Sequence, residues 1–187
     1  KPGLIYEIAN NGNVLSKSTA DTPSRKSIAY KSGDDIHKIS SQFGYSFKYD
    51  ANKEDLWLSG ENNGFSKSYV IQPKKEFFER PNKKLVLNDK VIGKITKAGK
   101  TYIVDFGKEY VGFCTFSLSS DMAQNINVAF GELLENGHVK RKIGPRDFSF
   151  DYASKKGKNK FTNYMLRLAC RYIEIECEHD IEIDFVA

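Results

Sequence analysis

Paired carboxylates are the residues of this sequence that could most readily do chemistry. Hydrolysis by a general acid and a general base needs two carboxyl groups that face each other across a cleft, one with a raised pKa. The neighbouring acids are Asp34 with Asp35, Glu54 with Asp55, Glu132 with Glu135, and Asp147 with Asp151. Proximity in sequence does not make side chains converge, and Asp147 and Asp151 fall on the polar face of an alternating segment. We therefore predict no catalytic residue among them.

The histidines and cysteines do not form a recognisable metal or nucleophile site. They are His37, His138, His179, Cys114, Cys170 and Cys177. No histidine has a second one at metal-ligand spacing, the cysteine spacing is not that of a zinc site, and no Gly-x-Ser-x-Gly sequence occurs. Cys170 and Cys177 could lie at the two ends of one strand, too far apart to bridge. We predict buried free thiols, no metal and no cofactor.

Asp105-Phe106-Gly107 is a triplet that protein kinases also carry. A kinase would need a glycine-rich phosphate loop and a catalytic His-Arg-Asp, and the sequence has neither. We predict instead that a strand ends here in a glycine turn, with Asp105 accepting local hydrogen bonds. Farther along, Arg171 and Glu174 are expected to take part in an ion-pair ladder of the kind that holds neighbouring elements together.

An aromatic group in the first half could contact sugar. Tyr45, Phe47 and Tyr49 alternate with polar residues, and Trp57 and Phe65 follow. The apolar face of a pyranose ring stacks on aromatic side chains, so Trp57, Tyr45 and Tyr49 are candidates for carbohydrate contact. Trp57 is the best candidate for an exposed ring. The alternation is also typical of rings buried in a sandwich core, and both interpretations stay open.

Short alternating segments must position all these residues. Many short strands with turn signals between them predict an all-β fold, a β-sandwich or jelly roll, with a smaller strand-rich N-terminal lobe. The predicted strands are 4–8, 14–18, 26–30, 45–49, 67–72, a hairpin over 85–92, 101–106, 110–118, 124–130, 147–152, 159–168, 171–177 and 181–185. The turn at 10–13 contains Asn-Gly, which favours a hairpin. Residues 34–42 suit either helical turns or an edge strand.

The charged segment 73–84 carries two prolines and is predicted to be a linker or crossing segment. It divides the chain into a strand-rich lobe over 1–80 and a sandwich over 81–187. Whether the two halves share one core stays open.

The net charge of +5 could suggest an anionic partner. The lysines, however, gather in two segments that are predicted to be solvated loops, one with Lys94, Lys97 and Lys100 and one at 155–160. No nucleic-acid-binding motif accompanies them, so no nucleic-acid partner is predicted. No apolar stretch is long enough to span a membrane, and no membrane partner is predicted.

The second half resembles the β-sandwich region of bacterial alpha-L-rhamnosidases. The matching residues are Asp105-Phe106-Gly107 with Gly112, Gly131-Glu132-Leu133-Leu134 with Asn136-Gly137, and Arg171-Tyr172-Ile173-Glu174. The first half is similar to the preceding segment of that family through Gln42-Phe43-Gly44, Tyr49-Asp50-Ala51 and Trp57. Some relatives carry adjacent acids after a Gly-Phe pair, implicated in calcium and rhamnose binding. Because the residues after Gly64-Phe65 are not acidic, no metal site is expected there.

The resemblance implies a parent glycoside hydrolase that removes terminal L-rhamnose with inversion. In that family both catalytic carboxylates lie in a toroid of paired helices that follows the β domains, so the sequence to Ala187 is expected to be a non-catalytic fragment without the toroid. Its implied partners are the catalytic helical domain of the same parent chain and rhamnose-containing glycans, in a bacterial periplasmic or extracellular setting. A carbohydrate-binding module and a cell-surface adhesion sandwich are the alternatives.

Overall fold

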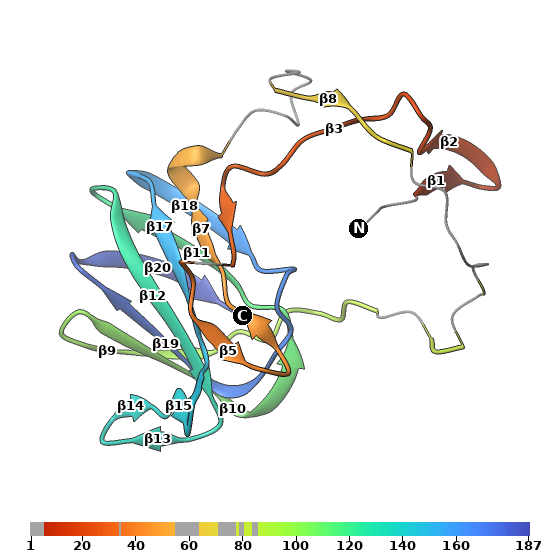
Figure 1. Ribbon diagram of the computed structural model, residues 1–187. Coiled ribbons are helices and arrows are strands. Elements are labelled where there is room, and N and C mark those ends of the chain that lie inside the picture. Colours follow the sequence, from red (N-terminus) through yellow and green to blue (C-terminus); the bar gives the residue numbers. More distant parts are fainter. Residues whose placement is uncertain (1–5, 34, 55–63, 71–77, 79–80, 84–85) are drawn as a thin grey trace. The chain divides into compact units, whose positions relative to one another are not determined.

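The computed structural model describes residues 6–33, 35–54, 64–70, 78, 81–83 and 86–187. Its contacts divide the chain into two compact units, Lys1–Ser27 with Asp55–Leu87, and Ile28–Glu54 with Asn88–Ala187 (Figure 1). Three residues singled out in the sequence lie outside the described residues: Trp57, and one acid from each of two carboxylate pairs, Asp34 and Asp55.

The first unit contains two short antiparallel strand pairs. β1 (Glu7–Asn10) pairs with β2 (Asn13–Lys17), and β3 (Pro23–Ser24) pairs with β8 (Ser66–Lys67). The connection between β1 and β2 has positive φ at both Asn11 (48°) and Gly12 (79°), the backbone that a two-residue hairpin turn requires. The predicted Asn-Gly hairpin is therefore confirmed.

The second unit is built on two sheets. The wide sheet has the order β4 (Tyr30–Lys31), β7 (Lys48–Asp50), β17 (Ser149–Ser154), β12 (Gln124–Gly131), β19 (Leu168–Cys177), β10 (Thr101–Gly112) and β9 (Lys94–Ala98). The narrow sheet has the order β18 (Gly157–Thr162), β11 (Thr115–Ser120) and β20 (Ile181–Val186). All neighbours are antiparallel except β7 and β17, which are parallel.

Three small hairpins and one turn of 3₁₀-helix complete the unit. The hairpins are β5 (Lys38–Ser40) with β6 (Gly44–Tyr45), β13 (Leu134–Glu135) with β14 (His138–Val139), and β15 (Lys142–Ile143) with β16 (Arg146–Asp147). The 3₁₀ turn η1 (Ala51–Lys53) follows β7 directly and begins where the Asp50 side chain accepts a hydrogen bond from the Asn52 backbone N–H.

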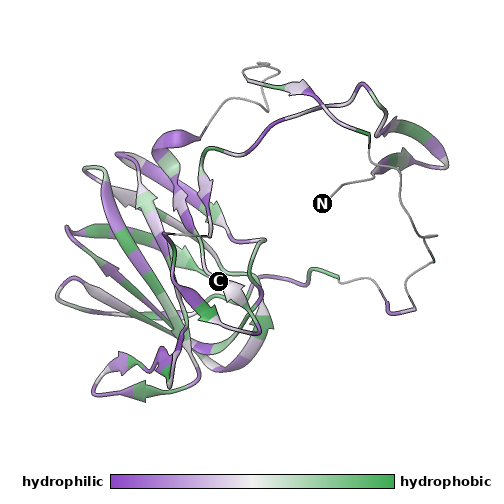
Figure 2. Ribbon diagram, viewed as in Figure 1, coloured by the Kyte–Doolittle hydropathy of each residue, from purple (hydrophilic) through white to green (hydrophobic). Residues whose placement is uncertain are grey.

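The two sheets of this unit pack face to face through aromatic rings. Phe161 on β18 lies 4.6 Å from the ring of Tyr49 and 5.2 Å from that of Tyr152, and Phe116 on β11 lies 5.0 Å from Tyr152, between ring centroids. Figure 2 shows hydrophobic and hydrophilic residues alternating along several of the strands, as expected when one face of each strand is buried. The all-β sandwich fold is confirmed.

Several strand predictions hold and others need correction. β12 confirms the segment 124–130, with Ile126, Val128 and Phe130 buried on one face. The predicted hairpin at 85–92 is wrong, because the described residues from 86 to 93 form no strand and the hairpin lies between β9 and β10. Lys94 and Lys97 are therefore on a strand rather than in a loop. β9 is an edge strand, where lysines are common because they discourage further pairing.

The predicted strand at 26–30 is also wrong, because residues 26–29 form no strand and β4 begins at Tyr30. Other differences lie at the ends of strands. β10 runs on to Gly112 past the predicted turn at Gly107, with an irregular register between Asp105 and Tyr110. β18 ends at Thr162 because the buried Asn163 side chain accepts hydrogen bonds from the backbone N–H groups of Met165 and Leu166 and bends the chain. In 34–42 the described residues contain β5, so the edge-strand alternative is the correct one.

Residues 28–54 pack with the strands of the second half. Their β4 and β7 extend the wide sheet, and the Phe47 ring stacks on that of Phe150 at 4.7 Å. The division of the chain at residue 80 stays a prediction. The core of the sandwich, however, includes side chains from residues 28–54, which precede that division.

All three cysteines are buried free thiols, as predicted. Cys170 and Cys177 lie on one strand, β19, and burial raises the pKa of both Cys114 and Cys170 to about 12. These two thiols therefore stay protonated at neutral pH, when thiolate is the reactive form.

Replacing Phe161 with Ala should remove the ring that joins the sheets. Phe161 is buried and touches rings from β4, β7, β11 and β17, so we expect a loss of about 3–5 kcal/mol of unfolding free energy. Urea unfolding followed by the far-UV circular dichroism signal measures it. The control Tyr164→Ala changes an exposed ring and should cost under about 0.5 kcal/mol; equal losses in the two variants would refute the role of Phe161.

Candidate functional site

A cavity of about 400 Å³ opens at one end of the wide sheet. The end of β12, the start of β19 and the end of β10 meet there, because neighbouring antiparallel strands bring opposite ends together. Gly131, the last residue of β12, and Glu132 after it line the cavity beside Arg146 of β16 and Phe148, which precedes β17. The start of the Gly-Glu-Leu-Leu motif is therefore at the cavity.

The charged residues around the cavity are mostly basic. Lys140, Arg146 and Arg167 line it together with one acid, Glu132, among the residues that the structure describes. Lys140 is already paired with Glu135 at 3.0 Å. For Arg146 and Arg167, both exposed, the described part of the chain offers no carboxylate within ion-pair distance. The cavity therefore has an excess of positive charge, because its two unpaired arginines outnumber the one described acid that lines it, Glu132.

Gly131 lets the backbone after β14 approach the sheet. A Cβ atom at this position would lie 3.0 Å from Val139 Cγ1 and 3.2 Å from the Lys140 carbonyl oxygen. Lys140 cannot easily withdraw, because its N–H donates to the Leu133 carbonyl at 2.9 Å. A glycine is therefore required at this point of the Gly-Glu-Leu-Leu motif for steric reasons.

Glu174 fastens the β13–β14 hairpin to the wide sheet. This nearly buried carboxylate accepts a hydrogen bond from the Val139 backbone N–H at 2.6 Å, and its other oxygen lies 3.0 Å from His138 Nδ1. The predicted pairing of Glu174 with Arg171 is wrong. Residues three apart on a strand point to opposite faces, so the two side chains cannot meet.

Arg171 instead binds Asp105 across β10 and β19. Its Nε and Nη2 donate to the two carboxylate oxygens at 2.9 and 3.0 Å, and the Gly107 N–H donates to Asp105 Oδ1 at 2.7 Å. The Arg171 hydrogen bond is the main cause that lowers the pKa of Asp105. The prediction that Asp105 accepts a local hydrogen bond is confirmed, and the pair spans the irregular part of β10.

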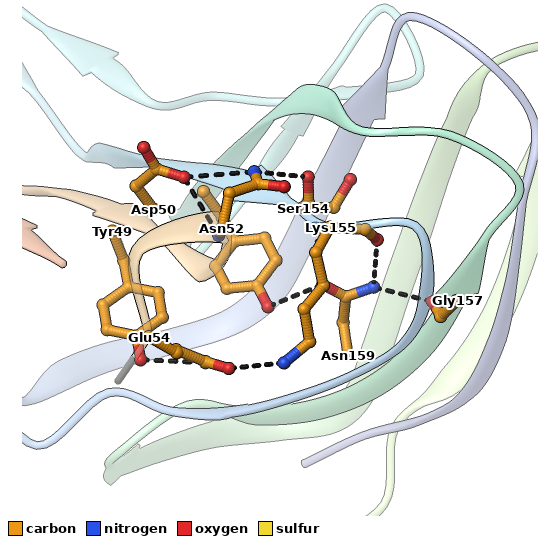
Figure 3. Close-up of polar contacts among 9 residues, drawn as sticks. Tyr49, Asp50, Asn52, Glu54, Ser154, Lys155, Gly157 and Asn159 are labelled. Carbon is orange, nitrogen blue, oxygen red and sulfur yellow. Dashed lines mark hydrogen bonds and ion pairs between the residues drawn. The ribbon is translucent and has the colours of Figure 1, made fainter. Parts of the chain in front are cut away.

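The residues predicted to contact sugar lie in different surroundings. Tyr49 is half-buried between Tyr30 and Phe161, and its hydroxyl donates to Glu54 at 2.9 Å (Figure 3). Burial, with this hydrogen bond second, raises the pKa of Tyr49. Tyr45 lies in the separate β5–β6 hairpin, where its ring is 43% exposed and Lys38 Nζ lies 5.0 Å from its centre. The third candidate, Trp57, is outside the described residues.

Figure 3 shows the contacts that hold the β7–η1 segment on the sandwich. Lys155 Nζ lies 2.6 Å from Glu54, and the Asn52 side-chain amide donates to the Ser154 carbonyl at 3.0 Å. The buried Asn159 side chain donates to the Lys155 and Gly157 carbonyls and fixes the turn that carries Lys155. Tyr49 and Glu54 thus have structural partners on the sandwich.

Asp147 and Asp151, which form one of the sequence pairs, also have partners. Asp147 Oδ1 accepts from Ser149 Oγ at 3.0 Å and lies 3.5 Å from Arg141 Nε, while Asp151 accepts from the Asn127 amide at 2.8 Å. Ser149, which alternates with the aromatic residues of this segment, is also buried. Ser46 Oγ donates to its carbonyl, and His37 Nε2 lies 3.5 Å from its hydroxyl.

In the part of the chain that the structure describes, no group of three or more histidine, cysteine, aspartate or glutamate side chains could hold a metal ion. None of its helices has the length and apolar character needed to cross a membrane.

Replacing Gly131 with Ala should push β14 away from the sheet. Because backbone and a buried side chain lie within 3.2 Å of the added methyl, we expect a loss of about 1–3 kcal/mol of unfolding free energy. The matched control is Gly112→Ala, where a Cβ meets nothing within 4 Å. If both variants unfold at the same urea concentration, the steric requirement at Gly131 is disproved.

The His138–Glu174 pair should make stability depend on pH. The Glu174 hydrogen bond raises the pKa of His138 in the folded protein, so folding favours the protonated ring. This contribution is fully present below the unfolded pKa of about 6.5 and is lost as the pH rises through the folded value. The unfolding free energy of wild type minus His138→Gln should therefore fall with rising pH over that window.

Urea unfolding of both proteins at a series of pH values measures this difference. His179→Gln is the control, because the backbone N–H of His179, not its ring, contacts Gln124. A difference between wild type and His138→Gln that does not change with pH would contradict the pairing.

Comparison with known proteins connects this architecture to a family. The model for the bacterial alpha-L-rhamnosidase concanavalin-like domain matches residues 95–184, which run from β9 to β20. No curated protein sequence matches the chain significantly.

Among solved structures, the alpha-L-rhamnosidase from Aspergillus terreus is similar with a TM-score of 0.58 and 17% identity, over 76% of this chain and 18% of that one. The enzyme from Dictyoglumus thermophilum has a TM-score of 0.57 and 16% identity, over 70% and 16%. At these identities the structures support the shared fold, and the chain spans under a fifth of their length. Residues 95–184 of this chain are therefore similar to the bacterial alpha-L-rhamnosidase concanavalin-like domain, and the chain shares its fold with these two enzymes.

Proposed function

We propose that the chain is a non-catalytic β-sandwich part of an alpha-L-rhamnosidase-like glycoside hydrolase and supports a catalytic helical domain of the same parent chain. The observation that carries the proposal is the family match over 95–184, which coincides with the sandwich strands. The proposed parent reaction is hydrolysis of terminal alpha-L-rhamnosides with inversion.

The environment of the carboxylates supports a non-catalytic role. Inversion needs an acid and a base about 6.5–9.5 Å apart, with room for water between them. Asp147 and Asp151 are bound by neighbouring side chains on the sheet, and Glu135 is paired with Lys140. Among the described acids of the candidate pairs, Glu132 alone lines the cavity at the sheet end, together with three basic residues.

An aryl alpha-L-rhamnoside assay tests the proposal. The purified chain should release no more aryl alcohol than buffer does, while the Aspergillus terreus alpha-L-rhamnosidase provides the positive control. Release above buffer that a variant such as Glu132→Gln abolishes would contradict the proposal.

A sugar-binding module is the second candidate function, and the exposed ring of Tyr45 favours it. An exposed aromatic face can stack on a pyranose, whereas Tyr49 presents a ring already packed on both sides. Calorimetric titration with L-rhamnose distinguishes the two roles. Heat that disappears in Tyr45→Ala or Trp57→Ala would establish a module, and the absence of heat would leave the supporting role.

A further inference from the structure

The cavity at the end of the wide sheet combines apolar walls with arginines. Its volume of about 400 Å³ lies in the range of about 300–1,000 Å³ that small-molecule sites occupy. Phe43 and Phe148 contribute aromatic rings, and Leu166 and Ile143 add aliphatic surface. Phe43 is 58% exposed, so part of this apolar surface is accessible to a ligand.

The two arginines are carried by well-defined turns. Arg146 pairs with Ile143 in the β15–β16 hairpin. Arg167 follows a loop that the fully buried Asn163 fixes, through hydrogen bonds from the Met165 and Leu166 N–H groups and to the Leu166 carbonyl. Strand pairing and the Asn163 side chain therefore fix the backbone that carries each arginine beside the cavity.

A ligand that suits this surface must satisfy both parts of it. Guanidinium groups bind carboxylates with two parallel hydrogen bonds, and the bonds are stronger than those between neutral groups. Aromatic side chains stack on the apolar face of a ring. A neutral sugar would leave the positive charge unmatched, and an inorganic anion would leave the apolar walls wet.

We propose that this cavity binds a small carboxylate ligand built on a ring with an apolar face, with Arg146 and Arg167 holding the carboxylate and Phe43 and Phe148 contacting the ring. Uronic acids and aromatic acids both have this chemistry. The site does not depend on the function proposed above, because it requires only binding to the sandwich and no turnover.

Titration of the full chain, monitored by NMR of its backbone amides, tests the proposal. The probes are D-galacturonic acid, benzoate and, as the neutral ligand, L-rhamnose. We expect saturable shifts at Gly131, Ala169 and their neighbours for at least one acid, with a dissociation constant on the order of 1 mM. Rising salt should weaken the binding, because the contact is ionic and exposed. The acid that binds more tightly shows whether the site prefers a uronic acid or an aromatic acid.

Two variants test whether each arginine contributes to binding. Arg146→Gln and Arg167→Gln should each weaken binding of that acid about ten-fold, the loss expected for one charge-assisted contact. Both positions are exposed, so folding should be preserved, and the thermal midpoint checks it. Lys156→Gln removes the same charge from an exposed turn that does not line the cavity and should leave binding unchanged.

Four outcomes would overturn the proposal. The first three are no saturable shift with either acid, shifts that map away from the cavity, and L-rhamnose binding as tightly as the acids. An equal loss of affinity in Lys156→Gln and the arginine variants would also overturn it, because it would reduce the effect to net charge.

Discussion

The sandwich depends on aromatic rings buried between two sheets of unequal width. Strand pairing satisfies the backbone but leaves each sheet with an apolar face that must be removed from water. Phe161 on the narrow sheet reaches Tyr152 and Phe150 on the wide one, and Phe47 stacks beside them. Each such ring contributes about 1.5–3 kcal/mol by burial. The hairpins, the cavity and the Glu174 contact are all built on strands that this packing fixes in place.

Much of this fold could be predicted because alternation is a local property. Ile126, Val128 and Phe130 are spaced two apart, so their common buried face follows from strand geometry alone. The Asn11-Gly12 turn is equally local, since it depends on two residues that tolerate positive φ. The lysines of β9 were misplaced because an edge strand exposed on its polar side looks like a loop when only composition is considered.

The candidate site could not be predicted in the same way, because its contacts join residues far apart in sequence. Arg171 binds Asp105, 66 positions away, across an irregular register that no local pattern reveals. Ser149 has the spacing of an exposed residue and is buried by Ser46, 103 positions earlier. Arg146 and Arg167 meet at one cavity because a hairpin and a loop come together at the same sheet end. The sequence shows that these residues are polar, but it does not show which residues they contact in the fold.

The pairing of β7 with β17 joins two stretches of the chain that the other unit separates in sequence. Residues 28–54 belong to the sandwich, residues 55–87 belong to the other unit, and the chain then returns at residue 88. The wide sheet is therefore complete only after a long loop has closed, and the entropy of that closure precedes the contacts that compensate for it. Cutting the polypeptide at residue 80 would separate an edge of the sheet from its core, exposing Phe150 and Phe161 to intermolecular association.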